Sequence, residues 1–266
     1  MRVAPYAVLL FLVRANAAAP PAVGDLLSRM IAAENAQEPE RAHYIYREHA
    51  ENFRLDGKLR HSSDYEWIYL EGQPYRKLVA YNGKPLKGKR AAEEERHFQM
   101  TRAQRRTSDA LRKPNPHIVS AGIEPAAVVR LMTHKVSGEE LIRGRPTWVV
   151  ESEPGPDVEQ ARSAKDRVTL CYKTTMWIDQ EDYAIAQIRW EVIREGPEVL
   201  PGSFASSTFE RLAPALWLRS VLAGEFSSGP PHPTDHWKQT HHFSDYHRFG
   251  TQSNVSFDAP TTKLPN

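Results

Sequence analysis

The sequence predicts a mainly β protein with some α-helix: one strongly curved antiparallel sheet of about ten strands, with helices covering its concave face. Three observations support this fold class. Many short segments have the composition or the two-residue period of strands, and they occur in unbroken series. Short linkers between them favour antiparallel pairing, because parallel strands need long crossovers. Two helical segments interrupt the strands, and a curved sheet needs elements of this kind to cover its concave face.

The first residues have the features of a secretory signal peptide. Arg2 precedes an apolar run from Val3 to Val13, and small residues suited to signal peptidase follow it. We therefore expect residues 1–19 to be cleaved and the mature protein to be periplasmic or otherwise extracytoplasmic. An uncleaved membrane anchor is the alternative. A span needs about twenty apolar residues, however, and Arg14 interrupts this run.

Composition narrows the classes of partner. The chain has 35 Lys and Arg against 33 Asp and Glu. Removal of residues 1–19 takes Arg2 and Arg14 with it, so the mature chain is formally neutral. Neutrality argues against a nucleic-acid partner, which requires a strongly basic face. Cys171 is the only cysteine, so neither an intramolecular disulfide nor an N-terminal lipidated cysteine is possible. We expect residues 20–266 to form a single domain and the protein to be a monomer.

The first half of this domain predicts a helix followed by a meander. Residues 22–36 carry an apolar stripe at helical spacing. Three probable strands follow, separated by connections of hairpin length. Their ranges are 41–53, 58–70 and 74–81.

A charged segment at residues 87–113 interrupts the strands and is composed of good helix formers. We expect it to be a helical insertion exposed to solvent. Its arginines could contact anionic lipid or nucleic acid. Three consecutive glutamates offset them, however, and a solvated helix face with mixed-sign pairs explains the pattern as well.

The second half continues with strands after a short helical pattern at residues 124–132. The clearest strand is 184–192, where small or apolar residues alternate with charged or amide residues and only Ile185 breaks the period of two. The β-rich segment 168–178 precedes it, with a polar turn at 179–182, so the two predict a hairpin. The other strand candidates are 133–142, 143–154, 202–212, 216–226 and 235–249.

Four motifs in this half resemble the LolA/LolB-like superfamily of outer-membrane lipoprotein-sorting proteins, and in particular its uncharacterised bacterial relatives. The resemblance covers roughly residues 130–250 and rests on segments 144–148 (GRPTW), 177–179 (WID), 217–218 (WL) and 243–249 (FSDYHRF). It implies a half-open antiparallel β-barrel in which helices plug the concave side and lipoprotein acyl chains bind. We therefore expect a periplasmic binder or carrier of an apolar or lipidic ligand. A lipid, a lipoprotein acyl chain or an envelope protein is the expected partner.

Candidate lining residues for such a ligand are large apolar side chains on the strands, namely Trp148, Ile188, Trp190, Trp217 and Leu218. Aromatic residues on strands often serve only as core packing, and that alternative stays open. The charged segment and the absence of a recognisable membrane-engaging hydrophobic loop also distinguish this chain from the sorting factors.

Catalytic signatures are missing. The sequence has no G-x-S-x-G, H-E-x-x-H, G-x-x-x-x-G-K-S/T or C-x-x-C motif. We therefore predict no catalytic residue, no cofactor and no enzymatic activity. Two alternatives to a carrier remain: an interaction or scaffold protein with a filled core, and a metal-dependent hydrolase.

Histidines near the C-terminus are the one candidate for a metal site. They are His232, His236, His241, His242 and His247, with Asp235 and Asp245 close in sequence. On a regular strand His241 and His242 point to opposite faces, so no strand places all five around one ion. We therefore predict no metal site here.

Overall fold

The computed structural model describes residues 21–107, 125–155, 161, 163–194, 199–229 and 235–249. The predicted signal peptide, residues 108–113 of the charged segment and His232 lie outside them. The helices are α1 (Val23–Arg41), α2 (Gly88–Thr107), α3 (Pro125–Leu131) and α4 (Ala164–Thr169). The strands are β1 (Tyr44–Phe53), β2 (Leu59–Leu70), β3 (Gln73–Tyr81), β4 (Lys84–Pro85), β5 (Met132–Ile142), β6 (Arg145–Pro154), β7 (Tyr172–Asp179), β8 (Ile185–Val192), β9 (Phe204–Ala213), β10 (Leu216–Ser228) and β11 (Asp235–Arg248).

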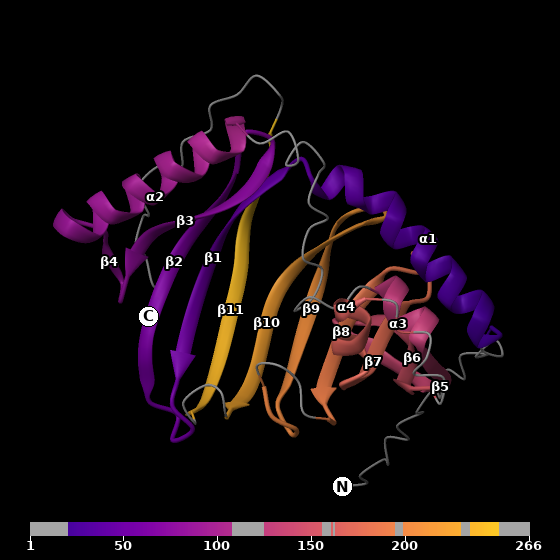
Figure 1. Cartoon of the computed structure of the whole chain (residues 1–266). Coiled ribbons are helices and arrows are strands. Elements are labelled where there is room, and N and C mark those ends of the chain that lie inside the picture. Colours follow the sequence, from indigo (N-terminus) through magenta and orange to yellow (C-terminus); the bar gives the residue numbers. More distant parts are fainter. Residues whose placement is uncertain are drawn as a thin grey trace, which may run out of the picture.

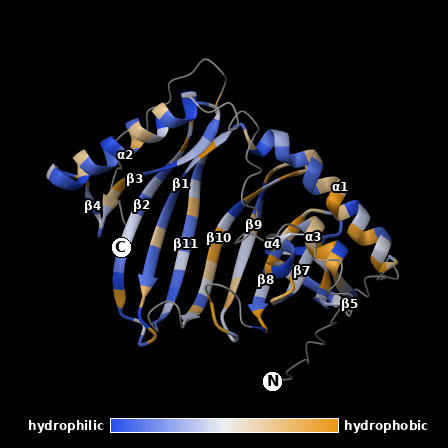
Figure 2. Cartoon of the chain, in the orientation of Figure 1, coloured by the Kyte–Doolittle hydropathy of each residue, from blue (hydrophilic) through white to orange (hydrophobic). Residues whose placement is uncertain are grey.

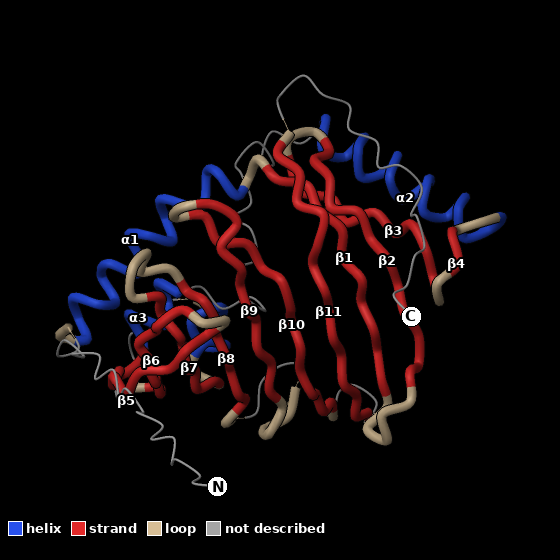
Figure 3. Tube along the Cα trace, turned by 180° about the vertical axis from the view of Figure 1, so that it is seen from behind, coloured by secondary structure: helices blue, strands red, loops and turns tan. Residues whose placement is uncertain are grey.

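All described strands form one antiparallel sheet, and the fold class predicted from the sequence is confirmed. The order of its eleven strands is β4-β3-β2-β1-β11-β10-β9-β8-β7-β6-β5. Because β4 and β5 are the two ends of this order, the curved sheet is open rather than closed. Helices α1 and α2 lie on the same side of it, α1 over the half that contains β5 to β10 and α2 beside β3 (Figures 1 and 3). None of the described helices combines the length and the hydropathy that a membrane-spanning helix needs.

Among the described residues, the main hydrophobic core cluster lies in the half of the sheet under α1 and α3. Hydrophobic residues gather on α1, α3 and the strands near them, whereas α2 is mostly hydrophilic (Figure 2). Leu26, Leu27 and Met30 of α1 pack against Met176, Ile185 and other buried residues of the sheet. This contact uses the apolar stripe that the sequence predicted for the first helix. Helix α2, in contrast, has no buried residue.

Two buried polar residues extend the inner stripe of α1 and bond it to the sheet. The Gln37 Oε1 atom accepts a hydrogen bond from the backbone N–H of Trp217 at 2.8 Å, and Glu34 Oε1 accepts one from Ile185 N–H at 3.2 Å. Arg41 donates from Nη1 to Glu34 at 2.7 Å and from Nε to the Trp217 carbonyl at 2.9 Å. The helix therefore bonds directly to backbone groups of β10 and of the start of β8.

The hairpin of β7 and β8 confirms the alternation read from the sequence. Ile188 and Trp190 are buried, and the charged or amide residues between them are partly exposed. Asp179 ends β7 with its side chain fully buried. Its Oδ1 accepts the backbone N–H groups of Glu181 and Asp182 at 3.0 and 2.8 Å. The aspartate therefore begins the turn, as the sequence predicted.

One predicted strand was partly wrong. Residues 168–171 do not belong to β7, because α4 occupies Ala164–Thr169 and the strand begins only at Tyr172. The Ser163 side chain caps α4 by accepting a hydrogen bond from the Asp166 backbone N–H. The Asp166 carboxylate in turn accepts a hydrogen bond from the Ser163 backbone N–H. Arg130 of α3 donates to Asp166 at 2.7 Å and so fixes this short helix against α3. These contacts outweigh the β-propensity of the segment.

Met30 and Met100 provide a matched test of where the core lies. Met30 on α1 is fully buried, whereas Met100 on α2 is 57% exposed. We expect Met30→Ala to lower the free energy of unfolding by about 2–5 kcal/mol and Met100→Ala to change it by less than about 0.5 kcal/mol. Urea unfolding followed by circular dichroism measures both values. Equal effects of the two substitutions would contradict the placement of the core under α1.

Candidate functional site

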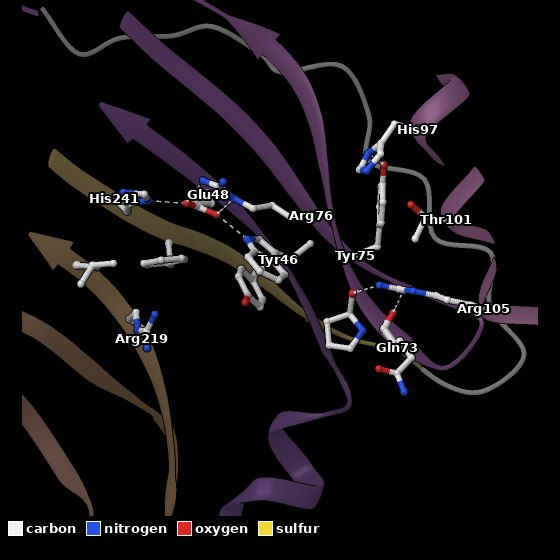
Figure 4. A pocket seen from close by; sticks show the side chains of 14 residues that line it. Tyr46, Glu48, Gln73, Tyr75, Arg76, His97, Thr101, Arg105, Arg219 and His241 are labelled. Carbon is white, nitrogen blue, oxygen red and sulfur yellow. Dashed lines mark hydrogen bonds and ion pairs between the residues drawn. The ribbon is translucent and has the colours of Figure 1, made fainter. Parts of the chain in front are cut away.

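A pocket lies on the α2 side of the sheet, outside the main core cluster. Its volume is about 630 Å³, and it lies between strands β1, β2, β3, β10, β11 and helix α2 (Figure 4). The apolar part of its wall is mostly aromatic, and the polar part is mostly basic. Its lining residues are Tyr46, Glu48, Trp67, Gln73, Pro74, Tyr75, Arg76, His97, Thr101, Arg105, Arg219, Leu222, His241 and Phe243.

Glu48 organises the polar part of the pocket. Its side chain is only 3% exposed and accepts four hydrogen bonds. Arg76 donates two of them, at 2.5 and 2.7 Å, Trp67 Nε1 donates one at 2.6 Å, and His241 Nδ1 lies 2.5 Å from Glu48 Oε1. These donors come from three different strands, so the carboxylate ties β1 to β2, β3 and β11.

Burial and hydrogen bonding act in opposite directions on this carboxyl. Burial alone raises the pKa of Glu48, but the bonds from His241, Arg76 and Trp67 outweigh it and lower the pKa from 4.5 to about 2. The group is therefore ionised at neutral pH. An ionised carboxylate can only accept, so His241 donates its Nδ1 proton to it. The His241 Nε2 atom is buried and has no hydrogen-bond partner among the described residues.

Arg219 lies on β10 amid aromatic rings. Its guanidinium carbon is 5.6 Å from the ring centroid of Phe243 and 5.9 Å from that of Phe209. Tyr246 donates from its hydroxyl to the Arg219 carbonyl. Burial lowers the pKa of the Arg219 guanidinium and raises the pKa of the Tyr46 and Tyr246 hydroxyls. Both tyrosines are therefore neutral, and the positive charge lies in surroundings that solvate it poorly.

The opposite end of the pocket is held by α2. Arg105 donates to the backbone carbonyls of Leu70, Gln73 and Pro74 at 2.9 to 3.0 Å. Tyr75 of β3 donates its hydroxyl to Glu94 at 2.9 Å and lies against the ring of His97. The bonds of Arg105 anchor α2 to the turn and strand start around β3, although the helix buries no side chain of its own.

Strand register explains why these side chains meet. In the pairing of β1 with β11, Glu48 lies opposite Phe243 and Ala50 opposite His241. Residues of this parity face the pocket. His49 has the other parity and pairs with Asp64 at 2.6 Å away from the pocket.

The five candidate lining residues are placed elsewhere. Ile188, Trp190 and Trp217 belong to the core cluster under α1, and Trp148 packs against it half-buried. Leu218 is also buried. None of the five lines the pocket. Their role in ligand binding stays a prediction, and their observed contacts are core packing.

The histidines are distributed as their parity predicts. His241 lines the pocket, and the adjacent His242 is exposed. His236 contacts the Ser227 hydroxyl at 2.7 Å. The one cluster of candidate metal ligands among the described residues is Asp179, Glu181 and Asp182. Two arginines pair with this acidic group: Arg145 bonds Asp179 at 2.7 Å and Arg211 bonds Asp182 at 2.8 Å.

Comparisons with known proteins find structural similarity without a sequence relative. No family profile matches the chain, and no curated protein matches it either. Three similar solved structures are a domain assigned to an outer membrane lipoprotein-sorting protein from Vibrio parahaemolyticus, a DUF1329 family protein from Desulfovibrio piger and a LolA superfamily protein from Nitrosomonas europaea.

Their identities to this chain are low. The Vibrio domain has 12% identity and a TM-score of 0.39, over 84% of this chain and 93% of that one. The Desulfovibrio protein has 11% identity and a TM-score of 0.39, over 87% of this chain and 92% of that one. The Nitrosomonas protein has 9% identity and a TM-score of 0.34, over 84% of this chain and 91% of that one.

Sequence reasoning missed the charged residues of the pocket. Glu48 and Arg76 lie on strands that were predicted, and His241 was considered only as a metal ligand. The sequence shows only that Tyr46, Glu48 and Ala50 lie on one face of the strand and Arg47 and His49 on the other. Both parities carry charge, so hydropathy did not show which face is inward.

Glu48 predicts a specific dependence of stability on pH. Because its pKa is lowered on folding, its contribution is fully present above pH 4.5 and is lost as the pH falls through about 2. The difference in unfolding free energy between wild type and Glu48→Gln should therefore shrink by about 3 kcal/mol between pH 6 and pH 2. Urea unfolding at several pH values measures it.

Glu153→Gln is the control, because that side chain is exposed on β6. The unfolding free energy of Glu153→Gln should stay close to that of wild type at every pH. A difference for Glu48→Gln that does not vary with pH would show that the carboxylate is not stabilised as described.

Proposed function

We propose that this protein binds or carries an apolar or lipidic ligand in the cell envelope, without catalysing a reaction. The observation that supports this most directly is the pocket of about 630 Å³, with walls from Tyr46, Trp67, Tyr75, Leu222 and Phe243. Its volume is within the range of small-molecule sites. The envelope location rests on the signal-peptide pattern at residues 1–19.

Burial of methylene groups sets the expected affinity. Ten methylenes at ~0.8 kcal/mol each contribute about 8 kcal/mol, and association costs at least about 4 kcal/mol. The remaining 4 kcal/mol or so corresponds to a dissociation constant near 1 mM. A ligand held more tightly must therefore be longer or have a polar anchor as well.

A filled-core interaction protein is the second candidate, because one observation favours it. Under α1 and α3 the concave face is occupied by the protein's own side chains. Among the described residues, the pocket that could hold a ligand lies in the half beside α2. The third alternative, a metal-dependent hydrolase, gains nothing from the histidines, since His241 bonds Glu48 and its neighbour His242 is exposed.

Filling the pocket tests the proposal. Leu222 lines the pocket on β10, whereas Leu212 on β9 is 48% exposed. Leu222→Trp should reduce the affinity for a fluorescent fatty-acid probe at least about tenfold by occupying ligand space, and Leu212→Trp should leave it unchanged. Fluorescence titration measures the affinity, and native mass spectrometry of protein from its own host tests for a retained lipid.

Thr101→Trp provides a second filling variant in case Leu222→Trp does not fold. Thr101 lines the pocket from α2, outside the core. Its effect should match that of Leu222→Trp, with the fold verified by circular dichroism. Wild-type protein that retains no lipid and does not bind the probe would overturn the proposal and leave the filled-core alternative.

A further inference from the structure

We propose that His49, Glu51 and His242 bind one divalent transition-metal ion, Zn²⁺ or an ion of similar ligand preference, on the face of the sheet opposite the pocket. Imidazole and carboxylate groups are a donor set that Zn²⁺ accepts. None of the three residues lines the pocket, so the site is separate from the proposed ligand-binding function. The sequence predicted no metal site because only histidines near the C-terminus were considered, whereas this site needs one from β1.

Strand pairing brings the two histidines together. Strands β11, β1 and β2 lie side by side (Figure 3), and His49 of β1 is directly opposite His242 of β11. Directly opposite residues of antiparallel strands point to the same face, with Cβ atoms about 4.5–5.5 Å apart. The register of this pair of strands shifts only between Ile45 and Arg47, before His49 is reached. Two imidazoles in this arrangement can reach one ion between them.

Asp64 orients the ring of His49. It lies opposite His49 on the other neighbouring strand, β2, and its Oδ1 atom is 2.6 Å from His49 Nδ1. A carboxylate bonded to one ring nitrogen fixes the orientation of an imidazole and leaves the other nitrogen for the metal. The Nε2 atom of His49 is therefore the ligand atom, and Asp64 is the residue that positions it.

Glu51 provides an oxygen ligand beside that nitrogen. It has the same parity as His49 along β1 and therefore points to the same face. Its Oε1 atom is 3.7 Å from His49 Nε2, which is too long for a hydrogen bond. Two ligands bound to a tetrahedral zinc ion at about 2.0–2.2 Å each lie ~3.4 Å from one another. A small adjustment of the Glu51 side chain therefore lets both atoms bind the same ion.

His242 completes the set by a change of rotamer. Its side chain is exposed, so the ring can turn toward His49 about its own χ1 bond. Among the described residues, the one group of three whose ligand atoms already lie close together is in the acidic turn at 179–182. That turn offers no nitrogen ligand, and an ion there would have to compete with the guanidinium groups of Arg145 and Arg211. Transition-metal ions prefer the imidazoles that His49 and His242 supply.

Titration with zinc chloride tests the inference on mature protein that carries no affinity tag. Wild-type protein should bind one equivalent of Zn²⁺ with a dissociation constant below about 0.1 mM. His242→Gln should weaken binding at least about tenfold because it removes one ligand, and Asp64→Asn should do so because it releases the ring of His49. Isothermal titration calorimetry at neutral pH measures the affinities and the stoichiometry.

His236→Gln is the matched control. His236 is exposed and has the same parity as His242 on β11, but it lies about 20 Å away along the strand. Its substitution should leave the affinity for Zn²⁺ unchanged. Electron paramagnetic resonance with Cu²⁺ then shows the ligands directly. The spectra of wild type and His236→Gln should show coupling to two nitrogen ligands, and that of His242→Gln coupling to one.

Two results would overturn the inference. One is a wild-type protein that binds no Zn²⁺ in this range or whose Cu²⁺ spectrum shows a single nitrogen ligand. The other is a loss of Zn²⁺ affinity in His236→Gln as large as that in His242→Gln, because it would indicate scattered binding to surface histidines. Circular dichroism verifies the fold of each variant, and the wild-type measurements hold even if Asp64→Asn fails to fold.

Discussion

The fold depends on the contact between α1 and one half of the open sheet. A curved sheet whose two edges do not meet cannot bury its concave face against itself, so another element must cover it. Leu26, Leu27 and Met30 provide the apolar contact. Glu34 and Gln37 then satisfy backbone N–H groups of the strands below, which apolar side chains could not do. The helix is therefore both the lid of the core and the hydrogen-bonding partner of the sheet.

The other half of the sheet is covered differently, and the pocket exists because of this difference. Helix α2 has no buried side chain and is held by polar contacts, above all those of Arg105 with three carbonyls. A helix attached in this way does not fill the space beneath it. The buried ion cluster around Glu48 ties four strands together at this place, and its donors come from the strands themselves. In this half of the sheet polar bonds hold the elements together, whereas under α1 apolar packing does so.

Much of the fold followed from sequence alone. The alternation in residues 184–192 predicted β8, and the apolar stripe predicted α1, because each pattern reflects burial on one face only. The pocket could not be predicted in the same way. Glu48 on β1 is a buried carboxylate that pairs with the half-buried Arg76 on β3, across β2. A charged residue in a strand ordinarily indicates the solvent face. The large apolar residues that predicted a ligand site pack in the core or against it, and their role in ligand binding stays a prediction.

Irregular strand pairing is a second reason why alternation in the sequence does not predict which residues face the pocket. Arg219 and Leu222 have opposite parity along β10, yet both line the pocket. The reason is a register shift between Arg219 and Val221, where Ser220 is the extra residue opposite Phe209 and Thr208. A bulge of this kind reverses the alternation after it and increases the local bend of the strand. One backbone feature thus curves the sheet and turns both a guanidinium and an apolar side chain toward the same space. The bulge in β10 therefore places one of the polar groups of the pocket and one of its apolar groups on the same face.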